Sequence, residues 1–291
     1  MKCCVVTGAS GLLGSQLIHL LTRDWEVHAV SRRCPVGFSA SNAIWHPIDL
    51  SREFDPSQLP ARTDAVIYLA QSEHFREFPE RAAEIFEVNT VGLLRFLQFA
   101  RQSGARKFVL ASSGGVYGPA DTTLNENLPV LAQGDLGFYL GSKLCAEIVA
   151  LNYAKLMSVT VLRFFFVYGP GQRRTMLIPR LIDNIRDGRV VTLQGEDGIR
   201  LNPTYVTDAV AAIVKALEFT GTHKINVAGP DVLSLREVCN VIGREVGRKP
   251  SFAVVREPPE HIVGDIERMK ELLGPPEVSF EEGLQLMLVS G

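Results

Sequence analysis

Tyr139 and Lys143 stand four residues apart in a stretch that opens a helical pattern, Tyr139-Leu140-Gly141-Ser142-Lys143. Residues at i and i+4 share one face of a helix, so the phenol and the ammonium would be neighbours. A tyrosine hydroxyl, with an ordinary pKa of about 10, is a poor base at neutral pH. A nearby ammonium lowers that pKa because it stabilises the phenolate. The pair alone is more typical of a solvated helix face, but it can also exchange a proton with a carbinol while a nicotinamide exchanges the hydride.

A second group of hydroxyls follows a predicted strand, in the stretch Leu110-Ala111-Ser112-Ser113-Gly114-Gly115-Val116-Tyr117-Gly118. Ligands bind at the carboxyl ends of strands in open α/β sheets. We therefore expect Ser113 to hold the same substrate oxygen that Tyr139 would protonate or deprotonate.

Three glycines at the amino terminus, Gly8, Gly11 and Gly14, lie between a short apolar run and a helical pattern. Gly8 permits a tight turn, Gly11 lets the backbone approach phosphates, and Gly14 brings the helix close to the strand. The unpaired N–H groups at the start of such a helix attract anions. This spacing predicts the pyrophosphate site of a dinucleotide.

The end of the second predicted strand bears on the choice of dinucleotide. An NAD enzyme normally places Asp or Glu there to accept from the ribose 2′-OH, whereas this chain has Ser31-Arg32-Arg33. An arginine can fork onto a 2′-phosphate, although both arginines could equally be solvated loop charges. The residues thus allow NADP or NAD and favour NADP.

Strand and helix patterns alternate through the first two-thirds of the chain. Apolar runs typical of buried parallel strands occur at residues 2–6, 26–30, 43–46, 64–70, 107–111 and 159–165. A helical region with one apolar face precedes the fifth run and carries Val91, Leu94, Leu97 and Ala100 on that face. Strands separated by helices predict an α/β fold with a doubly wound parallel (Rossmann) sheet.

From about Gly169 the predicted elements become shorter: helix 177–187, strand 190–193, helix 208–219 and helix 234–246. We expect residues 1–168 to form a dinucleotide-binding Rossmann domain. Residues 169–291 would form mainly a smaller substrate-binding domain that interleaves with the first.

The composition excludes several classes of protein. The 291 residues are 46% hydrophobic and 21% charged, as in globular proteins, and the net charge of −2 offers no basic field for nucleic acid. The most apolar run, 159–168, is interrupted by Arg163 and too short to span a bilayer, and no signal peptide is expected. Five cysteines without a C-x-x-C pair suggest reduced thiols in the cytoplasm. Six scattered histidines show no metal-ligand spacing, so we expect no metal site.

Taken together, these motifs resemble the extended short-chain dehydrogenase/reductases, especially the NAD(P)-dependent nucleotide-sugar epimerase/dehydratase family. The resemblance runs nearly end to end. It is carried by residues 7–14, 49–50, Asn89, 112–118, 139–143, 168–172, Arg200 with 205–208, 225–227, 264–266 and 273–274.

The resemblance implies roles for single residues. Ser113, Tyr139 and Lys143 match a catalytic triad, and Lys143 also matches the residue that holds the nicotinamide ribose. Asp49 and Leu50 match the adenine site, and Phe164 matches the position whose backbone meets the carboxamide. With the glycine turn, the expected cofactor-binding residues are Gly8, Ser10, Gly11, Leu12, Leu13, Gly14, Ser31, Arg32, Arg33, Asp49, Leu50, Leu69, Ala70, Gln71, Asn89, Ala111, Tyr139, Lys143 and Phe164.

The substrate side is expected to include Ser113, Phe166, Arg174 and Arg200, with Arg200 as the diphosphate ligand. Phe166 departs from the family pattern, which often has asparagine before V-Y-G-P and aims that amide at the phosphates. Gln71 replaces a common alanine. Gly114 and Gly115 stand where the family's 4,6-dehydratases carry an Asp-Glu pair, so elimination of water is not expected.

These features leave three functions open. The first is an epimerase that oxidises a nucleotide-sugar carbinol to a ketone and returns the hydride to the other face. The second is a reductase that uses NADPH on a 4-keto-sugar nucleotide. The third is a catalytically idle dinucleotide-binding sensor, which the intact Ser113, Tyr139 and Lys143 disfavour. The expected partner is a small-molecule substrate, and a homodimer is compatible with the resemblance.

Overall fold

The computed structural model describes residues 1–35, 38, 42–130 and 136–289. Contacts divide the chain into two compact units, each described by itself. Unit 1 consists of Met1–Val116, Val130–Arg163 and Val210–Ile225, and unit 2 of Tyr117–Pro129, Phe164–Ala209 and Asn226–Gly291. The sequence placed one main boundary at 168/169, whereas the chain leaves unit 1 first at Val116 and returns to it twice.

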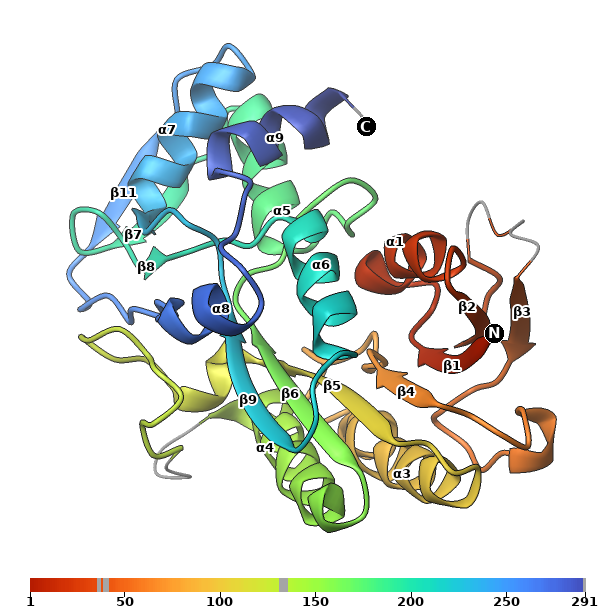
Figure 1. Ribbon diagram of the computed structural model, residues 1–291. Coiled ribbons are helices and arrows are strands. Elements are labelled where there is room, and N and C mark those ends of the chain that lie inside the picture. The colour runs from red at the N-terminus through yellow and green to blue at the C-terminus, as the bar shows by residue number, and fades with distance from the viewer. Residues whose placement is uncertain (36–37, 39–41, 131–135, 290–291) are drawn as a thin grey trace. The chain divides into compact units, whose positions relative to one another are not determined.

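The main sheet has seven strands in the order β3-β2-β1-β4-β5-β6-β9 (Figure 1). The registers of β1 with β2 and β4, of β2 with β3 and of β4 with β5 are parallel. The strands are β1 (Lys2–Thr7), β2 (Trp25–Ser31), β3 (Ala43–Pro47), β4 (Ala65–Tyr68), β5 (Lys107–Ser113), β6 (Ser158–Phe164) and β9 (Thr222–Val227). This strand order is that of a doubly wound dinucleotide-binding fold with one further strand, which confirms the predicted fold class.

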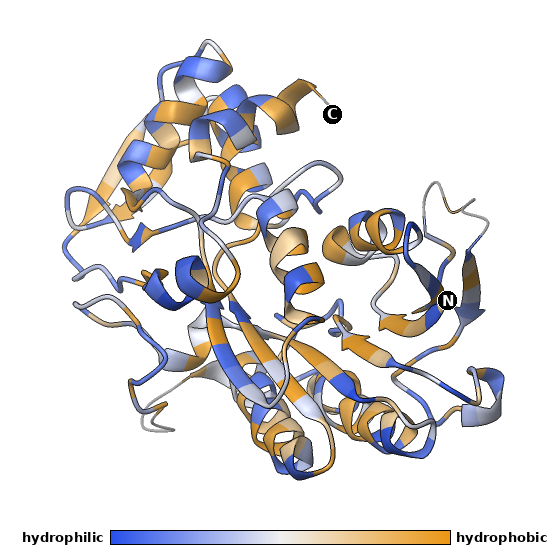
Figure 2. Cartoon of the chain, in the orientation of Figure 1, coloured by the Kyte–Doolittle hydropathy of each residue, from blue (hydrophilic) through white to orange (hydrophobic). Residues whose placement is uncertain are grey.

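Helices cover the sheet where the sequence placed them. In unit 1 they are α1 (Leu12–Leu21), α2 (Ala82–Phe86), α3 (Gly92–Gln102) and α4 (Gly137–Asn152), and 3-10 turns are η1 (Pro56–Gln58), η3 (Gly114–Tyr117) and η4 (Tyr153–Lys155). Helices α3 and α4 pack side by side against one face of the sheet (Figure 1). The strands that they cover are largely hydrophobic (Figure 2), so burial of this face drives the assembly of unit 1.

The apolar face of α3 differs from the prediction in two of its residues. Leu93 and Phe96 are fully buried, whereas Val91 and Leu94 are half-buried, although Leu97 and Ala100 are buried as expected. The predicted residues recur every three positions, whereas an α-helix has 3.6 residues per turn, so a strict spacing of three drifts off the buried face. Val91 also belongs to the π-helical turn η2 (Glu87–Val91) that precedes α3.

Unit 2 contains short elements: β7 (Val191–Gln194), β8 (Arg200–Leu201), β10 (Leu233–Ser234), β11 (Phe252–Val255), α5 (Leu177–Arg186), α7 (Leu235–Glu245), α8 (Glu267–Leu272) and α9 (Phe280–Val289). Helix α6 (Val206–Ala216) passes from unit 2 into unit 1. The ring of Tyr168 packs against the rings of Tyr205 and Phe280, and each pair of centroids is 5.4 Å apart. Among the described helices, none combines the length and hydrophobicity that crossing a bilayer requires.

Candidate active site

The turn after β1 requires glycine at two positions. Gly8 has a φ of +69°, and a Cβ there would lie 2.9 Å from the backbone of Leu69 and Ala70. A Cβ on Gly14 would lie 2.3 Å from the carbonyl oxygen of Gly8. Gly11 is the N-cap of α1 and has no side chain to bond the N–H groups of the first helical turn. The N–H groups at the start of α1 thus have no side-chain cap, and the pyrophosphate site expected there stays a prediction.

The other residues expected around this turn lie near it. Ser10 is exposed, and Leu12 and Leu13 begin α1. The Ala70 N–H donates to Thr7 Oγ1 over 3.2 Å, which joins the carboxyl ends of β1 and β4. Both strands therefore end at the edge where the dinucleotide is expected.

The side chains of the segment after β2 already have hydrogen-bond or ion-pair partners within the protein. Ser31 is buried, and its hydroxyl donates to the Arg33 carbonyl over 2.6 Å. Arg32 donates to Glu73 Oε1 over 2.5 Å, and Arg33 lies 3.8 Å from the other Glu73 oxygen. A 2′-phosphate would have to compete with the Glu73 carboxylate for Arg32. This pairing could not be predicted from the sequence, because Glu73 follows a different strand.

Asp49, expected at the adenine, is half-buried beside buried Leu50. Its Oδ1 accepts from the backbone N–H of Ser51 at 3.0 Å and from the Ser51 hydroxyl at 2.8 Å. Burial raises the pKa of Asp49, but the two Ser51 bonds outweigh it and hold that pKa below its usual value. The carboxylate is therefore fixed in its ionised form at the end of the β3 connection.

Tyr139 lies in the first turn of α4 and is half-buried. Its hydroxyl donates to Gln71 Oε1 over 3.0 Å, and its ring packs on Phe75 with centroids 4.9 Å apart. Burial raises the pKa of the Tyr139 phenol, against a smaller lowering by Arg76. The segment after β4 thus holds both the ring and the hydroxyl of the expected acid/base.

Lys143, one turn further along α4, is 3% exposed. Its Nζ donates to the Ala111 carbonyl of β5 over 3.1 Å. Burial lowers the pKa of Lys143 to about 8, while the Glu147 carboxylate raises it. The ammonium is therefore fixed beside β5, at the strand end that also carries Ser113.

Glu147 belongs to a buried polar cluster that the sequence analysis did not recognise. Its carboxylate pairs with Arg163 of β6 at 2.6 Å and accepts from the Ser112 hydroxyl at 2.5 Å. Glu147 and Arg163 are 1% and 2% exposed. Two signals were available: Glu147 is at i+4 from Lys143, and Arg163 interrupts an otherwise apolar strand. The cluster ties α4 to β5 and β6.

Ser113 ends β5, and its Oγ accepts from the Gly115 N–H over 3.2 Å. Leu140 of α4 covers Gly115 so closely that a Cβ there would lie 2.9 Å from its side chain. Ser113 is therefore on a turn packed directly against the helix that carries Tyr139 and Lys143. The structure brings the three expected catalytic residues onto adjoining elements.

Asn89 lies in the π turn and is 1% exposed. Its Oδ1 accepts from the Ser72 N–H at 3.0 Å, and its Nδ2 donates to the Ser142 hydroxyl at 2.9 Å. The amide thus joins the segment after β4 to the first turn of α4. Asn89 was expected among the cofactor-binding residues, and these bonds give it a positioning role for Tyr139.

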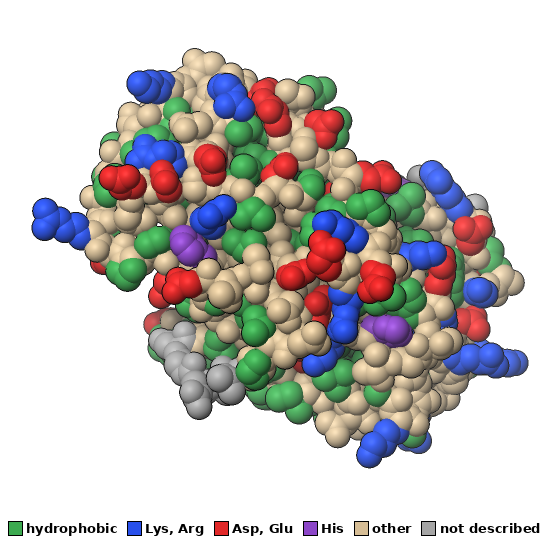
Figure 3. Space-filling model, turned by 60° about the vertical axis from the view of Figure 1, so that its left-hand side comes forward, with side chains coloured by type: hydrophobic (Ala, Val, Ile, Leu, Met, Phe, Trp, Pro, Cys, Tyr) green, Lys and Arg blue, Asp and Glu red, His purple; other side chains and the backbone are tan. Residues whose placement is uncertain are grey.

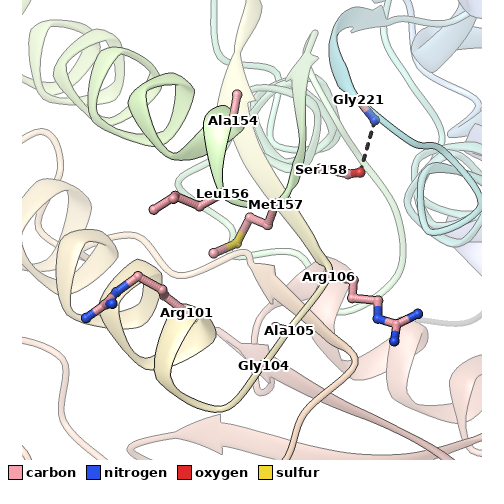
Figure 4. Close-up of a pocket in the computed structure, with 9 residues that line it drawn as sticks. All are labelled: Arg101, Gly104, Ala105, Arg106, Ala154, Leu156, Met157, Ser158 and Gly221. Atoms are coloured by element: carbon pink, nitrogen blue, oxygen red, sulfur yellow. Dashed lines mark hydrogen bonds between the residues drawn. The ribbon is translucent and has the colours of Figure 1, made fainter.

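An aromatic hollow of about 520 Å³ lies beside Tyr139. It is lined by residues 75, 76, 78 and 136–140, and the rings of Phe78 and Phe138 stack there with centroids 5.0 Å apart. The second hollow, about 510 Å³, is far less suited to a ligand (Figure 4). Its two arginines, Arg101 and Arg106, point in opposite directions and present no convergent polar group.

Of the expected substrate residues, Phe166, Arg174 and Arg200 lie in unit 2, whereas Ser113 lies in unit 1. Phe164, the last residue of β6, also belongs to unit 2. Phe166 has a φ of +44°, a left-handed conformation that asparagine tolerates better than phenylalanine. Arg174 is held by the Asp183 carboxylate of α5, with its Nε at 2.9 Å. Arg200 is exposed on β8, and its backbone N–H donates to His261 at 3.0 Å. Of the two arginines, Arg200 is the more available to an anion.

Charges on the face drawn in Figure 3 are mixed: basic and acidic side chains alternate over it without a large patch of one sign. On this face there is thus no continuous basic surface of the kind that binds nucleic acid.

The fold and this site define an enzyme with a dinucleotide-binding sheet and a tyrosine–lysine pair. The chain belongs to the NAD dependent epimerase/dehydratase family, whose model matches residues 4–228. It is 29% identical over 228 residues to a UDP-glucuronate 4-epimerase of Thermodesulfobacterium geofontis, covering 76% of this chain and 70% of that one. It is 27% identical over 296 residues to a dTDP-4-dehydro-6-deoxy-D-allose reductase of a Streptomyces species, covering 92% and 90%.

Among solved structures, the chain is similar to MoeE5 in complex with UDP-glucuronic acid and NAD. The identity is 29%, the TM-score is 0.85, and the match covers 99% of this chain and 98% of that one. The predicted family and enzyme class are thus confirmed. These relatives act on different nucleotide sugars by different reactions, so the family alone does not give the reaction.

Proposed function

We propose that this protein is an NAD(P)-dependent nucleotide-sugar epimerase that acts through a transient keto-sugar. The observation that carries the proposal is the fixed relation of Tyr139 and Lys143 on α4, with Lys143 anchored to Ala111 at 3.1 Å. The UDP-glucuronate 4-epimerase relative and the UDP-sugar bound to MoeE5 support it.

A bound nicotinamide would supply the acceptor and donor of hydride. Tyr139 Oη would take the carbinol proton during oxidation and return it during reduction, while Ser113 Oγ holds the same oxygen. The Lys143 ammonium would stabilise the phenolate electrostatically.

For the cofactor, we propose NAD rather than NADP. The comparisons give the earlier preference for NADP no support, since the complex with MoeE5 contains NAD. The pairing of Arg32 with Glu73 at 2.5 Å supports the revision because it occupies the guanidinium expected at a 2′-phosphate.

For the substrate, we propose a nucleotide sugar whose diphosphate binds Arg200. A charge-assisted hydrogen bond contributes ~1.5–3 kcal/mol, so Arg200→Ala should weaken substrate binding ~10–100-fold. The nucleotide-linked sugar should also bind far more tightly than the free sugar. Equal binding of both would remove the diphosphate from the proposal. Free cysteines remain compatible with a cytoplasmic enzyme.

The runner-up is a 4-keto-nucleotide-sugar reductase, and one observation favours it. Tyr139 is bonded to a neutral amide oxygen, an arrangement suited to a tyrosine that begins the reaction as proton donor. The Streptomyces reductase relative is in agreement. The intact Tyr139 and Lys143 leave the idle sensor as the weakest of the three.

Mass spectrometry of products separates these reactions. An isobaric product from a nucleotide hexose indicates the epimerase, and a gain of two hydrogens from a 4-keto sugar indicates the reductase. Loss of one water is not expected, because Gly114 and Gly115 have no side chains for it and Glu126 is buried with its Oε1 bonded to the Asn226 N–H at 2.7 Å. A product lighter by one water would overturn that exclusion.

A further inference from the structure

Side chains that can bind metals lie on one face of strands β1, β2 and β3. Cys3 of β1 is the register partner of Glu26 in β2, and His28 follows two residues later on the same face. His46 of β3 pairs with Val30, which shares that face with His28. The ligand atoms of Cys3, Glu26 and His28 all lie within 4.8 Å of one another.

The two histidines are hydrogen-bonded to each other. His46 Nε2 lies 2.8 Å from His28 Nδ1, so this contact occupies one ring nitrogen of His28.

The other ring nitrogen of His28, Nε2, lies 2.9 Å from Glu26 Oε1. An imidazole nitrogen and a carboxylate oxygen are both ligands that a metal ion such as Zn²⁺ accepts.

Thr63 adds an independent observation. It is 4% exposed, and its Oγ1 has no hydrogen-bond partner among the described residues. The same hydroxyl lies near the Cys3 thiol and lowers its pKa, although burial raises that pKa to about 11 overall. A buried hydroxyl without a partner is rare. It would gain one if Cys3 became a thiolate, as it does when it binds a metal.

We propose that Cys3, Glu26 and His28 bind one divalent transition metal ion, best matched by Zn²⁺. A thiolate, an imidazole and a carboxylate form a donor set that Zn²⁺ accepts. Thr63 Oγ1 donating to the Cys3 sulfur and His28 Nδ1 donating to His46 would form the outer shell that orients the ligands.

Binding displaces the thiol proton of Cys3, and any second proton of His28, into solvent. Cys3 precedes the end of β1 by four residues, roughly 13 Å at the rise of a strand, so the ion would cross-link β1 to β2 rather than join catalysis. The ligands are distant in sequence, and for this reason their spacing predicted no metal site.

The test uses the full chain, freed of metals with a chelator and titrated with Co²⁺ and Zn²⁺. We expect one ion per chain, a thiolate-to-cobalt charge-transfer band, and a Tm higher by ~5 °C at about a hundredfold excess over Kd. Cys3→Ser and His28→Gln should weaken binding at least ~100-fold and abolish the band, and Thr63→Val should weaken it ~10-fold.

Cys145→Ser and His223→Gln change an exposed and a half-buried residue of unit 1 outside the cluster and serve as matched controls that bind normally. Circular dichroism and dinucleotide binding establish that each variant is folded. Should the metal-free protein bind no Co²⁺, or should Cys3→Ser bind it as the native chain does, the proposal is wrong.

Discussion

The Tyr139 hydroxyl donates to Gln71 Oε1 over 3.0 Å, while the Lys143 ammonium donates to the Ala111 carbonyl over 3.1 Å. The proposed acid/base is therefore bonded to a neutral acceptor and not to the cation that would lower its pKa. A neutral acceptor stabilises the protonated phenol. Gln71, which stands where the resembling enzymes commonly have alanine, thus bears directly on when Tyr139 gives up its proton.

Substitutions at Gln71 should move the pKa of Tyr139 in opposite directions. Gln71→Ala removes the acceptor, so the pKa falls, by roughly one unit for a hydrogen bond of about 1 kcal/mol. Gln71→Glu places a carboxylate beside the phenolate, so the pKa rises. Ultraviolet titration, read as the difference between each protein and its Tyr139→Phe form, measures both shifts. Shifts of the same sign would mean that Gln71 acts only through packing.

Tyr139→Phe keeps the ring against Phe75 but removes the transferable proton. We expect turnover to fall ~10²–10⁴-fold, the usual contribution of general acid–base catalysis. Dinucleotide affinity should change little, because the ring packing stays. Single-turnover kinetics and a cofactor titration provide the two measurements, and near-normal turnover would remove Tyr139 from the mechanism.

Activity should decline on the alkaline side near pH 8. Burial lowers the pKa of Lys143 to about 8, so its ammonium is charged below that pH and lost above it. Glu147→Gln removes the charge that raises this pKa, and the decline should move to lower pH. Ser112→Ala loses only a hydrogen bond to Glu147 and should leave the profile in place. The pH dependence of kcat/KM tests this, and an unchanged profile in Glu147→Gln would contradict it.

The Glu147–Arg163 pair should be sensitive to loss of one partner. Both side chains are 2% exposed, and Arg163→Met leaves a buried carboxylate without its cation, at a cost of about 3–5 kcal/mol in the free energy of unfolding. The exposed pair of Arg189 with Asp187 supplies the control, since Arg189→Met should cost less than about 1 kcal/mol. Denaturant unfolding compares them, and equal losses would show that burial is not the cause.

Cofactor preference should depend on Glu73. The native protein should bind NAD more tightly than NADP, because Glu73 holds Arg32. Glu73→Gln frees the guanidinium and should raise NADP affinity ~10-fold, the effect of one charge-assisted contact, while Arg32→Ala in that background should abolish the gain. Fluorescence titration with both dinucleotides measures this. No gain for NADP in Glu73→Gln would place the arginines outside the ribose site.

Local patterns sufficed for much of this architecture. The glycine spacing located the turn after β1, and the period of apolar residues located the first six strands within a few residues. Strand β9 was not recognised because Thr222–Val227 begins with the polar residues Thr222, His223 and Lys224. The face of α3 was assigned only in part, because the predicted residues follow a period of three rather than the 3.6 of an α-helix.

The contacts that position Tyr139 could not be predicted, since Gln71, Phe75 and Asn89 approach α4 only through the fold. The pairing of Arg32 with Glu73, 41 residues away, is of the same kind. Residue types and spacing were enough to name the candidate residues. The distances between segments, which the sequence does not contain, determine the hydrogen-bond partners, the protonation and the neighbouring charges of those residues.

The division of the chain into two units, each built from three separate segments, constrains how the enzyme can be altered. The polypeptide crosses from one unit to the other five times, at the boundaries after residues 116, 129, 163, 209 and 225. No single cut therefore releases either unit as a continuous fragment. If the proposed substrate is correct, a change of specificity would therefore have to come from substitutions made in place rather than from exchange of the carboxyl-terminal part of the gene.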